Sequence, residues 1–144
     1  MTNVLDIIKN TSSAILFETD KVVVIFYEEL QIGHIRWKGN PNLEEYKIPF
    51  MTLLNHAKAG HTITKFLTDT REQGVVGPET RKWLTSELFP ACVEEGLQRV
   101  AAVSNANVFK KYYVNNVLNS VNTFGIPIKV VNDEKSAFEF LVND

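Results

Sequence analysis

The sequence has 144 residues, of which 44% are hydrophobic and 22% are charged, a composition typical of one globular domain and not of a disordered chain. A formal net charge of -2 at pH 7 argues against nucleic acid as a partner, because that partner needs clustered Lys and Arg. The single cysteine, Cys92, excludes a disulfide within the chain, and its apolar neighbours indicate a small buried side chain.

The first part of the chain has the pattern of three short strands. Residues 13–18, 21–28 and 30–37 are apolar runs rich in β-branched and aromatic side chains, and polar turn residues separate them. This pattern predicts an antiparallel meander. The preceding residues 1–12 are expected to form a short turn or a loose arm. Asp6 interrupts their apolar run and no cationic start precedes it, so the sequence does not predict a signal peptide.

After Pro41 the hydrophobic period changes from that of a strand to that of a helix. Residues 42–59 carry apolar side chains at helical spacing, and Asn40 or Asn42 can cap this helix. Pro49 lies inside the run. Because an interior proline removes a backbone hydrogen bond, we expect a bend or two short helices here.

From residue 63 onward, strand and helix patterns alternate. The predicted strands are residues 63–68, 98–104 and 126–131, and the predicted helices are residues 78–95, 106–124 and 134–141. Pro90 predicts a second kink, and Asn132 or Asp133 can cap the last helix. Strands that lack alternation and are followed by helices pair in parallel through right-handed crossovers. The sequence therefore predicts one α/β domain over residues 1–144, with a mixed β-sheet that starts antiparallel, continues as parallel βα units and has helices packed on it.

Two segments resemble a known group of proteins. They are KFLTDTRE, residues 65–72, and ELFPACVEEGLQRVAAVSN, residues 87–105. Together with the order of the elements, they resemble the bacterial STAS superfamily, and within it the SpoIIAA-like group, which shares its fold description with lipid-binding Sec14 domains. The resemblance covers residues 13–141. It implies this fold and a regulatory or binding role.

The sequence departs from one part of that pattern. Anti-sigma-factor antagonists of the superfamily carry an Asp-Ser-Ser-Gly-like turn before a helix, with a phosphorylated hydroxyl at the start of the helix. The corresponding turn here is VGPET, residues 76–80, which has no serine pair and whose only hydroxyl belongs to Thr80. The resemblance therefore does not imply a phosphorylation switch.

Open α/β sheets bind ligands where strand ends lead into helix starts, and the segment around residue 70 has this character. The candidate ligand-binding or partner-binding residues at this corner are Asp69, Thr70, Arg71, Glu79 and Thr80. A helix N-terminus attracts anions, but Glu79 already places a negative charge in the first turn. Arg71 can pair with Asp69, Glu72 or Glu79. Two interpretations stay open: a charged corner that pins the loop, or a contact site for a ligand or partner.

The histidines show no catalytic or metal-binding pattern. His34 alternates with Ile35 in a predicted strand and is expected to face solvent. His56 and His61 are five residues apart, which is not the spacing of a zinc-binding helix. The sequence contains no recognisable nucleophile–base pair, metal-ligand set or phosphate-binding glycine motif. We therefore predict no catalytic residues, no cofactor and no metal site.

Four aromatic residues bear on whether the domain is an interaction module or a carrier of an apolar ligand. Tyr46, Phe50, Trp83 and Phe89 lie on apolar helix faces, where they belong to the core or line an apolar groove. The leading hypothesis is a non-enzymatic, STAS-like regulatory or protein-interaction module of unknown partner. The alternative is a carrier of a small apolar ligand or lipid, as in Sec14-like domains. We expect a cytoplasmic protein without a membrane span, and the free edges of a small mixed sheet allow a homodimer.

Overall fold

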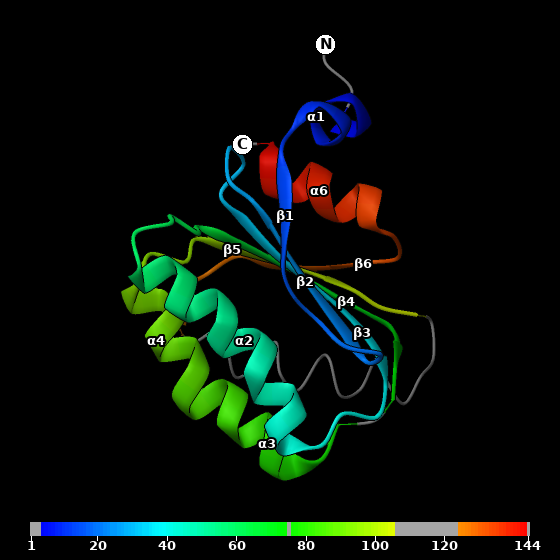
Figure 1. The fold of residues 1–144 in the computed structure, drawn as a ribbon, viewed down its shortest axis with the longest axis vertical. Helices are drawn as coiled ribbons and strands as arrows, with labels where there is room; N and C mark the ends of the chain where they lie inside the picture. Colours follow the sequence, from blue (N-terminus) through cyan, green and yellow to red (C-terminus); the bar gives the residue numbers. More distant parts are fainter. Residues whose placement is uncertain (1–3, 75, 106–123, 144) are drawn as a thin grey trace.

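The computed structural model describes residues 4–74, 76–105 and 124–143, in which a six-stranded sheet carries helices on both faces (Figure 1). In spatial order the strands are β1 (Ser13–Glu18), β2 (Val22–Tyr27), β3 (Ile32–Gly39), β4 (Lys65–Gln73), β5 (Arg99–Val103) and β6 (Ile128–Val131). The helices are α1 (Val4–Asn10), α2 (Leu43–Lys58), α3 (Pro78–Trp83), α4 (Phe89–Glu94) and α6 (Glu134–Val142).

The pairing of the strands confirms the predicted fold class. The pairs β1–β2 and β2–β3 are antiparallel, whereas the pairs β3–β4, β4–β5 and β5–β6 are parallel. The sheet is therefore mixed, with an antiparallel start followed by parallel βα units. The helix predicted at residues 106–124 lies almost wholly outside the described residues.

The sheet separates two apolar cores, because alternate side chains of a strand point to opposite faces. On one face, α2, α3 and α4 cover a core that contains Val24, Ile35 and Phe50 (Figure 1). On the other face, α1 and α6 cover a core that contains Ile32 and Leu67. Each side of the sheet thus has its own helical layer.

The amino-terminal segment is a helix, α1, where the sequence led us to expect a turn or a loose arm. Val4 of this helix is buried in the core beneath α6, and this contact orders the segment. Within the three described ranges, no helix is long and apolar enough to cross a membrane.

Of the two outcomes expected at Pro49, a bend or two short helices, the second is wrong, because α2 is one continuous helix. It begins with a capping box in which the Glu45 N–H donates to the Asn42 side chain and the Asn42 N–H donates to the Glu45 carboxylate. Pro49 is fully buried. Packing of both halves of the helix on the sheet offsets the one hydrogen bond that the proline cannot make.

The chain also remains helical through Pro90, and the disturbance expected there takes the form of a π-helical turn, Leu84–Leu88, between α3 and α4. The Phe89 N–H donates to the Leu84 carbonyl, five residues back. This wider turn accommodates the proline ring, which would clash with the carbonyl four residues before it in a regular α-helix.

The close approach of α2 to the sheet depends on Gly33. A β-carbon at this position would lie 2.9 Å from Leu53 Cδ1 and 3.4 Å from Ile63 Cγ2. A methyl group there would force the side chain of Leu53 to move within a packed core. Glycine at this position therefore lets α2 rest directly on β3.

We expect Gly33→Ala to lower the free energy of unfolding by about 1–3 kcal/mol, because the added methyl group overpacks the core between β3 and α2. Gly77→Ala is the matched control, since nothing lies within 4 Å of a β-carbon at Gly77 and its φ of -70° suits any residue. Urea unfolding of the two variants tests this. Equal stabilities would contradict close packing at Gly33.

Candidate functional site

The structure changes the setting of three candidate residues, because β4 is longer than predicted. The sequence predicts a strand over residues 63–68, whereas β4 continues to Gln73, so Asp69, Thr70 and Arg71 lie inside the strand and not after it. The extension follows from β3, which runs equally far and pairs with the last residues of β4. Pairing with a neighbouring strand here outweighs the polar composition of the segment.

A β-bulge lies at these residues. Arg36 is opposite Asp69 and Lys38 is opposite Glu72, so two residues of β4 face one residue of β3. Without the extra residue, Asp69 and Glu72 would point to opposite faces of the sheet. With it, both carboxylates line the same hollow, and Arg71 lies between them.

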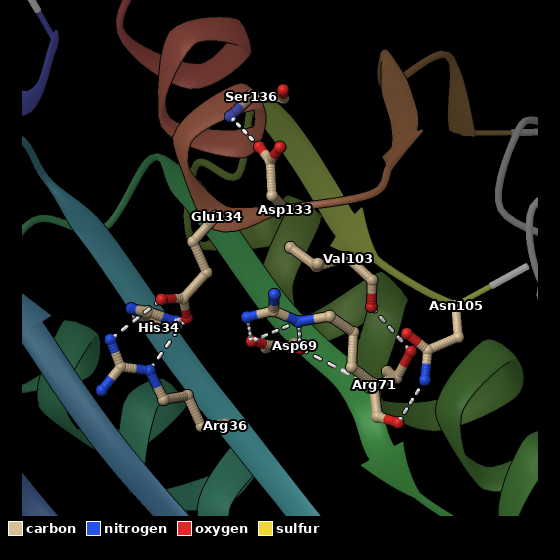
Figure 2. Close-up of polar contacts among 10 residues, drawn as sticks. His34, Arg36, Asp69, Arg71, Val103, Asn105, Asp133, Glu134 and Ser136 are labelled. Atoms are coloured by element: carbon tan, nitrogen blue, oxygen red, sulfur yellow. Dashed lines mark hydrogen bonds and ion pairs between the residues drawn. The ribbon is translucent and has the colours of Figure 1, made fainter.

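Arg71 forms a bidentate ion pair with Asp69 (Figure 2). Its Nε donates to Oδ1 at 3.0 Å, its Nη2 donates to Oδ2 at 2.6 Å, and its backbone N–H donates to Oδ1 at 3.1 Å. The Asp69 side chain is nearly buried, whereas that of Arg71 is 36% exposed. Such charge-assisted pairs fix the guanidinium plane. The sequence left three partners open for Arg71, and in the structure its partner is Asp69.

Two further hydrogen bonds fasten the bulge of β4 to the end of β5. The Thr70 hydroxyl donates to the Val103 carbonyl at 2.8 Å, and the Asn105 side-chain amide donates to the Arg71 carbonyl at 2.7 Å. Thr70 is buried, so its hydroxyl serves this internal contact and not a surface one. Asn105 belongs to the site although the sequence analysis did not single it out.

A second ion-pair cluster, which the sequence analysis missed, lies beside the first. Arg36 donates to both oxygens of Glu134, from Nε at 2.8 Å and from Nη2 at 3.0 Å. The Nε2 atom of His34 lies 2.8 Å from Glu134 Oε2. The expectation that His34 faces solvent is wrong, because this side chain is fully buried between Tyr27 and Phe138. The alternation of polar and apolar residues along a strand does not reveal whether a helix covers the polar face of that strand.

The register of the strands explains why apolar and charged side chains meet here. One row across the sheet holds Ile25, His34, Leu67 and Ala101, and the next row on the same face holds Val23, Arg36, Asp69 and Val103. The core beneath α6 contains the apolar members of the first row and also Val103 of the second row. Glu134, the first residue of α6, binds His34 in that row and Arg36 in the next. The helix therefore begins above the boundary between the row of His34 and the row that carries Arg36 and Asp69.

Glu134 stays charged although it is partly buried. Burial raises the pKa of this carboxyl, but the hydrogen bonds from His34 and Arg36 outweigh it and hold the pKa well below its ordinary value. Asp133, the N-cap of α6, accepts the Ser136 N–H at 2.7 Å. That hydrogen bond lowers the pKa of Asp133 as well. Both carboxylates complement the positive end of the helix dipole.

Next to the first turn of α6, the sheet face forms an open polar hollow of about 410 Å³. Its lining consists of Arg36, Trp37, Asp69, Arg71, Glu72 and Asn105. The side chains of Arg36 and Arg71 are 49% and 36% exposed, and within the described part of the chain Nη1 of neither has a partner. Two positive and two negative side chains balance one another. The hollow can therefore donate hydrogen bonds from the two fixed arginines and accept them at Glu72, without attracting one sign of charge.

The two remaining candidates, Glu79 and Thr80, lie elsewhere. They occupy the first turn of α3, which contacts α2 on the other face of the sheet (Figure 1). Glu79 is exposed and Thr80 is buried. Among the described residues, no hydrogen bond or ion pair joins Glu79 to Arg71. Of the five predicted residues, only Asp69 and Arg71 line the hollow.

A smaller apolar cavity of about 50 Å³ lies between α2 and α4. Phe50, Leu53, Phe89 and Cys92 are among its lining residues. Burial, with a contribution from Glu95, raises the pKa of the Cys92 thiol to about 11, so the thiol is unreactive near neutral pH. The four aromatic residues that the sequence analysis weighed, Tyr46, Phe50, Trp83 and Phe89, all pack in the core on this face.

His56 and His61 form a stacked pair at the end of α2. Their ring centroids are 3.8 Å apart and their planes differ by 2°. Parallel rings cannot both direct a nitrogen in-plane at one ion, so this geometry is unsuited to sharing a metal. Within the described ranges, no three His, Cys, Asp or Glu side chains are grouped as a metal site.

Comparison with known proteins identifies the fold. Neither a family model nor a curated protein matches the sequence. A solved structure is similar over 90% of this chain and 92% of its own, with a TM-score of 0.53 and 18% identity: an uncharacterized protein of the DUF3478 family, with a SpoIIAA-like fold, from Shewanella loihica PV-4. The chain has a SpoIIAA-like fold. The resemblance found in the sequence is thereby confirmed at the level of the fold, and the likeness carries no function.

We expect Glu134→Gln to lower the free energy of unfolding by about 1.5–3 kcal/mol at neutral pH, because the amide weakens charge-assisted hydrogen bonds to His34 and Arg36. The folded-state pKa of Glu134 is depressed, so its contribution is present above the unfolded value of 4.5 and is lost as the pH falls below it. Urea unfolding across this range should show the gap between wild type and variant shrinking in acid.

Glu94→Gln is the control for this experiment, since it makes the same chemical change at an exposed position on α4. This control should match the wild type throughout. A stability gap for Glu134→Gln that stays constant from neutral to acidic pH would contradict a role for the charge of Glu134.

Proposed function

We propose that this domain is a non-enzymatic binding module and that a partner protein docks on its charged face. The charged face consists of Arg36, Asp69, Arg71, Glu72 and Asn105, on the strands beyond the first turn of α6. The observation that carries this proposal is a pair of arginines, each immobilised by a carboxylate and each still partly exposed.

The immobilisation of the two arginines favours binding. Glu134 accepts two hydrogen bonds from the Arg36 side chain and Asp69 accepts three from the Arg71 side chain, and both carboxylates are anchored in regular elements. Ordering a long side chain on association costs about 0.5–1.5 kcal/mol, and here much of that ordering precedes binding. Arginine is also enriched among the residues that dominate binding energy at interfaces. The charged face therefore has the properties of a preformed contact surface.

The balance of charge on the charged face indicates the kind of partner. Arg36 and Arg71 offer donors at Nη1, and exposed Glu72 offers a carboxylate acceptor. The two oxygens of Asp69 already accept two hydrogen bonds each from Arg71. A polyanion such as nucleic acid would meet the two carboxylates unfavourably. A protein surface that presents both acidic and basic groups complements this arrangement.

The side chains of the charged face suit contact better than chemistry. Both arginines are already paired, and the nearby hydroxyl of Thr70 is buried and donates to a backbone carbonyl. Nucleophilic catalysis needs an accessible nucleophile beside a base. Together with the SpoIIAA-like fold, this supports a regulatory or protein-interaction role over an enzymatic one.

We expect Arg71→Ala to weaken partner binding by about 30-fold, the loss typical of a central arginine, without unfolding the domain. Partners would be captured from the host with wild-type protein, identified by mass spectrometry, purified, and titrated against each variant. Arg71→Lys keeps a cation beside Asp69 but loses the bidentate geometry, so it should also bind weakly while melting close to the wild type.

Lys58→Ala is the matched control, because it removes one positive charge at an exposed position near the end of α2. Binding by this variant should equal that of the wild type. If Arg71→Ala melts several degrees lower and binds normally, the ion pair of Arg71 with Asp69 is a structural corner and the proposal is wrong.

The apolar cavity between α2 and α4 supports a second candidate, a carrier of a small apolar ligand. Its volume of about 50 Å³ is well below the roughly 150 Å³ that accommodates benzene in an engineered cavity. A lipid chain would therefore require α2 and α4 to separate. Native mass spectrometry of protein purified from its host distinguishes the candidates: we expect the mass of the protein alone, and a mass excess matching a lipid or metabolite would favour the carrier.

A further inference from the structure

The two edges of the sheet differ in their protection against pairing with another strand. Natural edge strands avoid such pairing by being short and by carrying proline or lysine. The edge strand β6 has four residues, directly follows Pro127 and exposes Lys129. The edge strand β1 has six residues, with neither proline nor a basic side chain. By these criteria β6 is the better protected edge, because β1 has only a β-bulge at Leu16 and the carboxylate of Glu18 at its end.

The edge strand β1 also carries an exposed apolar side chain on one face of the sheet. Ile15, in the middle of the strand, is 62% exposed, more than any other large hydrophobic residue in the described ranges. In the described part of the chain β1 pairs only with β2, so the backbone N–H and C=O groups on its other side have no strand partner. An accessible apolar side chain beside unpaired backbone groups is what an added strand would cover.

We propose that β1 pairs antiparallel with the β1 strand of a second copy of this chain, around a two-fold axis near Ile15. The two sheets then continue into one another. This inference is independent of the proposed docking on the charged face, since it rests on β1 alone.

The sequence of β1 is complementary to itself in this arrangement. With the axis at Ile15, that residue faces its own copy and Glu18 faces Ser12. With the axis between Ile15 and Leu16, these two residues face each other and Glu18 faces Ser13. In both registers apolar side chains meet, the carboxylate meets a hydroxyl donor, and no like charges are opposed.

The contrast between the edges determines the symmetry of the contact. Pairing of β1 with β6 of another copy would build an open chain of molecules, and Lys129 on the short β6 strand disfavours it. Pairing of β1 with β1 closes after two copies. A β-bulge at Leu16 interrupts the regular pairing of β1 with β2 and increases the local twist. The contact is therefore a concentration-dependent dimer and not an obligate one.

Sedimentation equilibrium of the full chain, from micromolar to millimolar concentration, tests this proposal. The wild type should shift from monomer to dimer across the series. Ile15→Lys should raise the dissociation constant at least about tenfold, because it removes the apolar pair and places a charge on the edge. Val130→Lys, the matched change on the β6 edge, should leave the dissociation constant unchanged.

Two results of the sedimentation series would overturn the proposal: a wild type that stays monomeric throughout, or a dimer that Val130→Lys disrupts and Ile15→Lys does not. The melting temperature of dilute Ile15→Lys should match that of the wild type, since the side chain is exposed. Hydrogen exchange adds an independent measurement. Amides on the outer side of β1 should exchange more slowly as the protein concentration rises, and unchanged exchange there would also overturn the pairing.

Discussion

The arrangement of this domain depends on the contacts that the Glu134 carboxylate makes with His34 and Arg36. As the first residue of α6 it binds His34, at the end of the apolar part of the sheet face, and Arg36, in the charged part. At the other end of the helix, Arg99 donates to the Phe140 carbonyl at 2.7 Å. The sheet thus holds α6 at both ends. The length of sheet that the helix covers determines where the core ends and the charged face begins.

The bulge in β4 determines what the charged face contains. Because of one extra residue, the carboxylates of Asp69 and Glu72 lie on the same side of the sheet, with Arg71 held between them. The proposed contact surface is therefore part of the sheet and not a loop at its end. Side chains on paired strands lose less conformational entropy on binding than side chains on a loop, which favours recognition by a preformed surface.

The similar solved structure identifies the fold and leaves the function to the sites, as expected for a fold that is shared at 18% identity. Two surfaces of this molecule suit contact with other chains. The charged face lies on β3, β4 and the residues just after β5, whereas the less protected edge is β1, with β2 between the two. A second copy on β1 would thus leave the charged face accessible, so self-association and partner docking can coexist.

Local signals in the sequence were sufficient for the order of the described elements from β1 onward and for the α/β class, since hydrophobic period acts over a few residues. They also narrowed two helix caps to a pair of residues each, of which Asn42 and Asp133 serve. The ion pair between Asp69 and Arg71 was within reach because the two residues are neighbours on one strand. Local signals could not predict the length of β4, the burial of His34 or the ion pair of Arg36 with Glu134. Arg36 and Glu134 are 98 positions apart, and only the packing of α6 on the sheet brings them together.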